Sequence, residues 1–253
     1  MEPEGSHAAE SVQPPSEWPT AGKIEFRNYS MRYRQGEDLV LKDVSLTIHP
    51  GEKIGIVGRT GAGKSSLARA LFRLYEGASG SILVDGEDIS KLDLGGMRPR
   101  IGIIPQDSAL FGGTVRGNLD PLCEFTIEDM WAALIKSIGL RKHVGYGGGG
   151  FSAGQRQLFS LCRALMRKRK ILVLDEATAD VDLETDRAMH DAIHTEFKDC
   201  TILTIAHRLD TVMSSDRIIV MDQGRVAEFD TPENLIAKGG LFAQLVESNN
   251  IGK

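Results

Sequence analysis

The sequence contains no apolar run that approaches the roughly 18 residues needed to cross a bilayer. Its first residues do not join a basic start to an apolar stretch, so they do not form a secretory signal. We therefore expect a chain that is itself soluble and inserts no segment into a membrane. The hydrophobic share of 41% is still enough for a sizeable core, which excludes a disordered or fibrous chain.

Cysteine and positive charge are also scarce. The three cysteines, Cys123, Cys162 and Cys200, are odd in number and far apart, which excludes a CxxC zinc site and an even disulfide framework. This favours a reducing, cytosolic compartment. The 30 Lys and Arg against 35 Asp and Glu give a net charge of −5 at pH 7. A weakly acidic chain lacks the field that holds a phosphate backbone, so we expect no nucleic acid partner.

Strand and helix patterns alternate along most of the chain. Residues 1–20 hold four prolines among small and acidic residues and predict a flexible leader. Apolar and β-branched runs predict strands at 24–33, 39–48, 53–57, 81–84, 101–104, 171–174, 201–205 and 217–221, and helical spacing predicts helices at 64–75, 127–138, 154–166 and 183–197. The alternation predicts an α/β fold whose mainly parallel sheet is covered on both faces, while the early strands predict an antiparallel sheet beside it.

Residues 58–65 have the sequence GRTGAGKS, which satisfies the phosphate-loop pattern G-x-x-x-x-G-K-[ST]. The loop follows a predicted strand and opens a predicted helix, so its N–H groups and the helix N-terminus can bind phosphate. Lys64 would place its charge on the β/γ-phosphate oxygens, and the Ser65 hydroxyl would bind Mg²⁺. A glycine-rich turn without a ligand is the alternative. The residues expected to contact nucleotide here are Gly58, Arg59, Thr60, Gly61, Ala62, Gly63, Lys64, Ser65 and Ser66.

Two carboxylates follow the predicted strand at 171–174. Asp175 suits Mg²⁺, since a hard cation prefers oxygen ligands, and Glu176 would polarise the attacking water. The alternative is a pair of acids that simply end a strand at the surface. Together with the phosphate loop, the pair predicts a nucleotide-binding enzyme that uses Mg²⁺, a description that also fits GTPases, kinases and helicases.

The segment between these two motifs separates the possibilities. Residues 151–157, FSAGQRQ, resemble the L-S-G-G-Q signature of ATP-binding-cassette (ABC) ATPases. Gln106 resembles the family's Q-loop glutamine, residues 179–182 resemble its D-loop, and His207 resembles its switch histidine. With the phosphate loop and the Asp-Glu pair, these motifs stand in the family's order.

A finer resemblance is to the second nucleotide-binding domain of subfamily C, the multidrug-resistance-associated exporters. It covers the chain from about residue 22 to residue 247. The segments that carry it are 26–34, 55–61, 104–107, 118–121 and 171–182.

The resemblance implies a P-loop NTPase core with a mixed, mainly parallel sheet, an N-terminal antiparallel β-subdomain and an inserted helical subdomain at about 107–168. It implies one domain over residues 21–248 and a short tail at 249–253. ATP would lie between this domain and a second nucleotide-binding domain, and hydrolysis would drive export of organic anions or conjugates. The transmembrane domains of the exporter would be further partners, at the cytoplasmic face of a plasma or vacuolar membrane. A soluble ABC-type ATPase and a regulatory nucleotide-binding module are the alternatives.

The resemblance also assigns nucleotide-binding residues outside the phosphate loop. Tyr33 would stack on adenine, although Tyr29 on the same predicted strand competes for this role. Ser152, Gly154 and Gln155 would bind the nucleotide that the partner domain holds.

Catalysis and metal binding are assigned in the same way. The catalytic residues would be Glu176 as general base, His207 on the γ-phosphate, and Gln106. Mg²⁺ would be held by Ser65, Gln106 and Asp175.

Two features depart from the family pattern. The signature has Phe151 and Ala153 where the family has Leu and Gly, and the segment ahead of it is short and runs through GYGGGG at 145–150. We expect the high backbone entropy of this run to weaken the approach of the signature to the partner's nucleotide and the coupling to a membrane domain. ATP binding at Lys64 should be kept.

Overall fold

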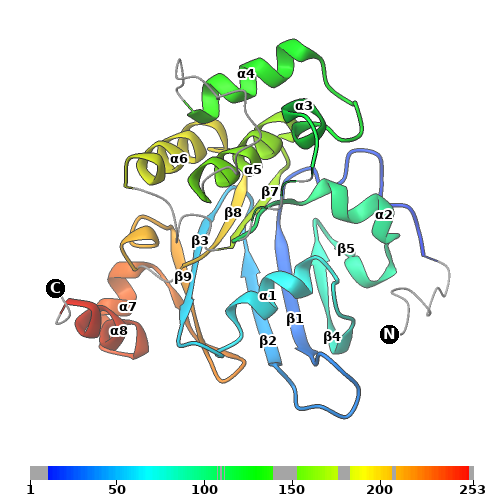
Figure 1. Cartoon of the computed structure of the whole chain (residues 1–253). Coiled ribbons are helices and arrows are strands. Elements are labelled where there is room, and N and C mark those ends of the chain that lie inside the picture. Colours follow the sequence, from blue (N-terminus) through cyan, green and yellow to red (C-terminus); the bar gives the residue numbers. More distant parts are fainter. Residues whose placement is uncertain are drawn as a thin grey trace.

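The computed structural model describes residues 11–106, 108, 110, 112–138, 153–175, 183–206 and 209–250. Its strands are β1 (Ile24–Met31), β2 (Leu41–Ile48), β3 (Lys53–Gly58), β4 (Gly77–Val84), β5 (Glu87–Asp88), β6 (Gly102–Ile104), β7 (Ile171–Asp175), β8 (Thr201–Ile205), β9 (Arg217–Asp222) and β10 (Arg225–Asp230). Its helices, labelled in Figure 1, are α1 (Lys64–Leu71), α2 (Leu94–Met97), α3 (Val115–Leu119), α4 (Ile127–Ile138), α5 (Ala153–Arg167), α6 (Leu183–Glu196), α7 (Pro232–Lys238) and α8 (Leu241–Asn250).

The strands form two sheets. One has four strands in the order β2-β1-β4-β5, with antiparallel neighbours. The other has six strands in the order β10-β9-β3-β8-β7-β6, and its neighbours are parallel except for β10 with β9. This arrangement confirms the predicted α/β fold, in which an antiparallel sheet lies beside a mainly parallel one.

Strand β7 shows how both faces of the larger sheet are covered. Alternate side chains of a strand point to opposite faces. Ile171 and Val173 belong to the hydrophobic cluster that contains α1 and the antiparallel sheet, whereas Leu172 and Leu174 belong to the cluster that contains α5 and α6. All four side chains are buried. Helices α1 and α5 therefore lie on opposite faces of the six-stranded sheet.

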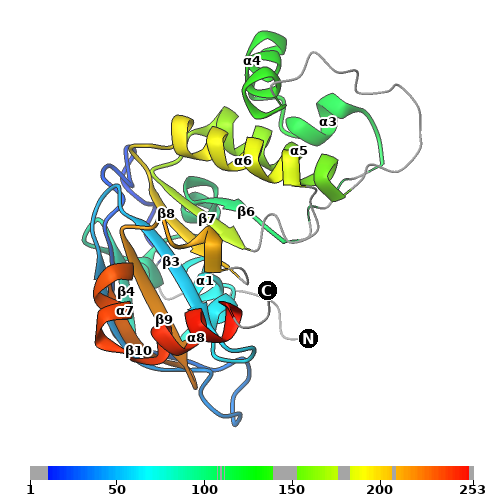
Figure 2. The ribbon, with the colours of Figure 1, turned by 90° about the vertical axis from the view of Figure 1, so that its left-hand side faces the viewer.

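Helices α3, α4 and α5 pack together above the sheet. Leu119 of α3, Met130 of α4, and Phe159 and Cys162 of α5 form one buried cluster. Figure 2 shows α5 and α6 against the sheet, with α4 farther from it. Within the described part of the chain, no helix combines the length and the apolar composition needed to cross a membrane.

Helix α1 is shorter than the sequence predicts. The helical spacing extends to residue 75, but the helix ends at Leu71 and Arg73 has a φ of 47°. The Arg73 guanidinium donates to the carbonyls of Ile89 at 2.9 Å and Leu92 at 2.7 Å. These bonds join the chain after α1 to a segment that follows β5, and β4 begins at Gly77 rather than at residue 81. The spacing of apolar residues cannot predict a helix end that is set by contacts with a distant segment.

The predicted flexible leader is wrong for residues 11–20, which pack against the rest of the chain. Trp18 is 4% exposed, and its Nε1 donates to the carbonyl of Val84 at 2.8 Å. The Arg100 guanidinium donates to the carbonyls of Pro15, Ser16 (2.9 Å) and Trp18 (2.9 Å). Proline has a fixed φ and no N–H donor, so this proline-rich segment offers carbonyls to Arg100 at a low entropy cost.

Replacing Trp18 by Ala should lower the free energy of unfolding by about 3–5 kcal/mol, because a buried indole is lost and its cavity remains. Urea denaturation of the chain measures this change. Leu122→Ala is the matched control, since Leu122 is 68% exposed and its loss should cost less than about 0.5 kcal/mol. Equal costs for the two variants would contradict the packing of residues 11–20.

Candidate nucleotide-binding site

The carboxyl ends of the parallel strands meet at one edge of the six-stranded sheet. Ile205 of β8 lies beside Ile56 of β3 on one side and beside Asp175 of β7 on the other. The predicted phosphate loop leaves β3, Asp175 ends β7, and Gln106 follows β6. The topology therefore brings three sequence-predicted elements to the edge at which open α/β sheets bind their ligands.

Two glycines of the phosphate loop are required by its conformation. Gly58 has a φ of 147°, and a Cβ there would lie 2.3 Å from the backbone oxygen of Met221. Gly63 caps α1 with a φ of 106° in the left-handed region. Residues with a side chain rarely adopt such φ angles. The backbone conformation therefore favours glycine at both positions.

Lys64 lies inside the loop. It is 7% exposed, and its Nζ donates to the carbonyls of Gly58 at 2.9 Å and Arg59 at 3.3 Å. Its position as the first residue of α1 adds the N–H groups of the first helical turn, which have no acceptor within the helix. A buried ammonium and a helix N-terminus together make a site for anionic phosphate.

The remaining loop residues divide by exposure. Arg59, Thr60 and Gly61 are exposed, whereas Ala62 is buried against the hydrophobic cluster around α1. Ser65 is half-buried in the first turn of α1. The predicted contact residue Ser66 is 6% exposed, and its hydroxyl pairs with the hydroxyl of Tyr33 at 2.7 Å.

The structure separates the two candidate tyrosines. Strand β1 ends at Met31, so Tyr33 lies in the segment after the strand and not on it as predicted. Tyr33 is half-buried, and its ring lies edge-to-face with the ring of Tyr75 at a centroid distance of 4.7 Å. Its hydroxyl accepts a hydrogen bond from the Arg69 guanidinium at 3.2 Å. Tyr29 is 4% exposed, and this burial raises its pKa to about 12. Tyr29 is therefore a core residue, and Tyr33 is the better candidate for an adenine platform.

Oxygen donors for a cation lie on three elements at the sheet edge. Asp175 is half-buried at the end of β7, Ser65 lies in the first turn of α1, and Gln106 has an exposed side chain after β6. Hydroxyl, carboxylate and amide oxygens are the donors that Mg²⁺ prefers. The chemistry of this donor set fits the predicted metal.

Sequence reasoning missed Gln157, which lies on α5 and is 5% exposed. Its side-chain amide donates to the carbonyls of Pro105 (3.0 Å) and Gln106. A signal was available, because Gln157 and Ser160 are polar residues three apart on a helix with an apolar core face. Gln157 was instead read only as the last residue of the signature segment 151–157.

Several predicted residues lie outside the described part of the chain: Ser152, Glu176, His207 and the glycine run at 145–150. Gly154 is buried in the first turn of α5, and the backbone of Gln155 continues that turn.

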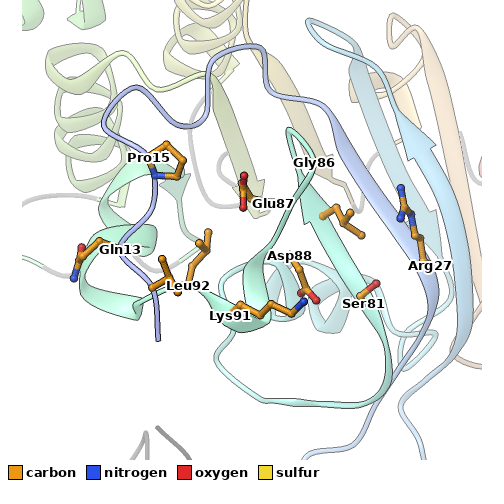
Figure 3. Close-up of a pocket in the computed structure, with 11 residues that line it drawn as sticks. Gln13, Pro15, Arg27, Ser81, Gly86, Glu87, Asp88, Lys91 and Leu92 are labelled. Carbon is orange, nitrogen blue, oxygen red and sulfur yellow. The ribbon is translucent and has the colours of Figure 1, made fainter. Parts of the chain in front are cut away.

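A hollow of about 610 Å³ lies elsewhere, between residues 12–15 and the region of β4 and β5 (Figure 3). Val12, Gln13 and Pro15 line one side, and Glu87 and Lys91 line the other. It contains none of the predicted nucleotide-binding residues.

The sequence profile of the ABC transporter family matches residues 41–179. This match spans more than half of the chain and includes the phosphate loop, Gln106 and Asp175. The chain belongs to the ABC transporter family. The resemblance inferred from the ordered motifs is confirmed.

Individual relatives support the resemblance to subfamily C. The chain is 53% identical to human "ATP-binding cassette sub-family C member 3" over 95% of its own length, and 53% identical to "Metal resistance protein YCF1" of Saccharomyces cerevisiae over 90%. It spans 16% of the length of each. A solved structure, "Structure of a bacterial Atm1-family ABC exporter with ATP bound", matches with a TM-score of 0.84 and 31% identity over 95% of this chain and 44% of that one.

Replacing Tyr33 by Ala should raise the ATP dissociation constant about five- to tenfold, because roughly 1 kcal/mol of ring stacking is lost. Tyr33→Trp and Tyr33→Phe keep an aromatic face and should bind within about twofold of the parent. Isothermal titration calorimetry measures all three constants.

Tyr29→Phe is the matched control for this prediction, since it alters a tyrosine of the core and should leave ATP affinity unchanged. The assignment is wrong if Tyr29→Phe weakens binding more than Tyr33→Ala does, or if Tyr33→Phe weakens it as much as Tyr33→Ala. The second result would place the effect in the hydroxyl contacts with Ser66 and Arg69.

Proposed function

We propose that this domain binds and hydrolyses ATP with Mg²⁺ as one nucleotide-binding domain of a subfamily C exporter. The observation that carries the proposal is the buried ammonium of Lys64 inside a glycine loop, at the sheet edge where Asp175 also ends its strand. Family membership and the ATP bound to the solved bacterial exporter support ATP as the nucleotide.

Phosphate binding depends on charge that is already in position. Lys64 meets the β/γ-phosphate oxygens in exchange for the carbonyls of Gly58 and Arg59 that it now contacts. The first-turn N–H groups of α1 hold the same oxygens through the helix dipole. Phosphoryl transfer gains most of its acceleration from such fixed electrostatic contacts, which stabilise charge on the transferred group.

Ser65, Asp175 and Gln106 would hold Mg²⁺ through hydroxyl, carboxylate and amide oxygens. When bound, the metal would supply positive charge that offsets the charge developing on the transferred phosphoryl group. Glu176 follows Asp175 directly and takes the proton of the attacking water as general base. His207 follows the neighbouring strand β8 by two residues and contacts the γ-phosphate.

A second nucleotide-binding domain completes each site. Gly154 and Gln155 lie in the first turn of α5, and Ser152 directly precedes this helix in the sequence. Helix α5 lies on the opposite face of the sheet from α1, which follows the phosphate loop. This separation favours contact of the signature with a nucleotide on the partner domain. Through that pairing and the transmembrane domains of an exporter, the domain works at the cytoplasmic face of a plasma or vacuolar membrane and drives export of organic anions or conjugates.

Glu176→Gln tests the hydrolytic step. The variant should bind ATP with the affinity of the parent and lose turnover by about 10²-fold or more, because the amide cannot accept the proton of water. Phosphate release measures turnover, and titration without hydrolysis measures affinity. Turnover near that of the parent would remove Glu176 from the mechanism, and ATP binding without turnover in the parent would favour the regulatory module.

Lys64→Met tests the binding site itself. Removing the ammonium should weaken ATP binding at least about tenfold, since a charged contact with phosphate is lost. Lys198→Met is the matched control, because Lys198 is exposed and distant in sequence from the phosphate loop. Equal ATP affinity in the two variants would contradict the site.

A further inference from the structure

A buried polar cluster joins α5 to the chain after β6. Gln157 and Ser160 come from α5, and Ser108 comes from the segment that follows Gln106. Their exposed fractions are 5%, 3% and 5% for Gln157, Ser160 and Ser108. Burying a polar atom costs free energy unless the atom has a hydrogen-bond partner. The partners of these three side chains therefore decide whether the cluster is tolerated in the core.

Each of the three side chains has a hydrogen-bond partner, and the donor of each bond can be assigned. Gln157 Nε2 donates to the carbonyl of Pro105 at 3.0 Å and to the carbonyl of Gln106, which uses both of its N–H groups. Ser108 Oγ donates to Gln157 Oε1 at 3.0 Å. Because Ser108 has one hydroxyl proton, its 2.8 Å contact with Ser160 is one in which Ser160 donates.

The orientation of the Gln157 amide follows from these partners. Turning it over would place Oε1 against two carbonyl oxygens and Nε2 against the Ser108 hydroxyl. Glutamate at this position would have no N–H donors, and asparagine would be one methylene shorter. Glutamine therefore matches both the reach and the donor count of the contact.

The contact fixes a segment that the sheet itself holds weakly. Within the described residues β6 has three residues, lies at the edge of the sheet and ends its pairing with Ile104 beside Leu174. Pro105 and Gln106 lie just past that last pair. Their two successive carbonyls are held by Gln157, whereas the side chain of Gln106 is exposed at the edge that carries the phosphate loop.

We propose that Gln157 is a positioning residue, whose buried amide holds the backbone of Pro105 and Gln106 so that the Gln106 side chain reaches the metal. The inference rests on the proposed function, since it takes Gln106 as a metal ligand. It also links two motifs within one domain: Gln157 stands three residues after Gly154, so a displacement of α5 moves the backbone of Gln106 with it.

The test measures metal affinity directly and does not depend on turnover. Mn²⁺ replaces Mg²⁺, and its affinity for the chain bound to a non-hydrolysable ATP analogue is followed by electron paramagnetic resonance. Gln157→Met keeps the side-chain length and removes the three bonds. It should weaken Mn²⁺ binding about tenfold, as loss of an outer contact to a metal site does, and leave metal-free affinity for the analogue within about twofold.

A double-mutant cycle shows whether Gln157 acts through Gln106. Gln106→Ala should weaken Mn²⁺ binding by a similar factor, and Gln106→Ala/Gln157→Met should weaken it no further. Additive losses would overturn the proposal, since they would mean that the two residues act separately.

Two further variants separate positioning from stability. Leu161 is fully buried on α5, so Leu161→Ala should lower the thermal midpoint without changing Mn²⁺ affinity. Ser160→Ala keeps all three bonds of Gln157 and should bind Mn²⁺ as the parent does. Unchanged Mn²⁺ affinity in Gln157→Met, or an equal loss in Leu161→Ala, would show that Gln157 is only structural.

The outcomes also separate this inference from the proposed function. If the parent chain binds the analogue and Mn²⁺ but does not hydrolyse ATP, the hydrolytic proposal is wrong. The Mn²⁺ affinities of the double-mutant cycle then still decide the role of Gln157. A parent whose Mn²⁺ affinity is unaffected by Gln106→Ala would overturn the positioning role while ATP hydrolysis stands.

Discussion

The parallel ladder that joins β3, β8 and β7 is the constraint on which the nucleotide-binding edge depends. It aligns the end of β3, where the phosphate loop begins, with Asp175 through the shared neighbour Ile205. A slip of one residue would turn Val173 from the α1 face to the α5 face and would displace Asp175 at the same time. Two hydrophobic clusters therefore fix the register, and the site residues are placed without having to stabilise the fold themselves.

Strand β6 is a short strand at the edge of the same sheet, and long-range hydrogen bonds hold the chain before and after it. It has three residues at the sheet edge, and its Ile103 is 43% exposed. Arg100, two residues before the strand, is bonded to carbonyls of residues 15–18, and Gln157 is bonded to carbonyls just after it. The N-terminal segment is thus bonded to the chain just before this short strand, and α5 to the chain just after it.

Local patterns predicted the features whose causes are local. Helix α4 and strand β8 have the predicted bounds, and the phosphate loop is a continuous motif that the sequence located directly. The end of α1 was not predictable in this way, because Arg73 bonds to carbonyls that follow β5. Residues 11–20 were misjudged for the same reason, since the partner of Trp18 lies more than sixty residues away. Gln157 was missed because it was read only as part of the signature motif, and its partners stand about fifty residues earlier in the chain.

Helix α5 carries two features at different positions along its length. The departures from the family signature, Phe151 and Ala153, stand at or before its first residue. The contact with Gln106 is made at Gln157, one turn later, and Leu161 anchors the same helix in the core beyond it. The departures from the family signature and the contact to the chain after β6 therefore stand about one helical turn apart along α5. Because one helix carries both, a shift of its first turn is transmitted to the carbonyls of Pro105 and Gln106 through Gln157.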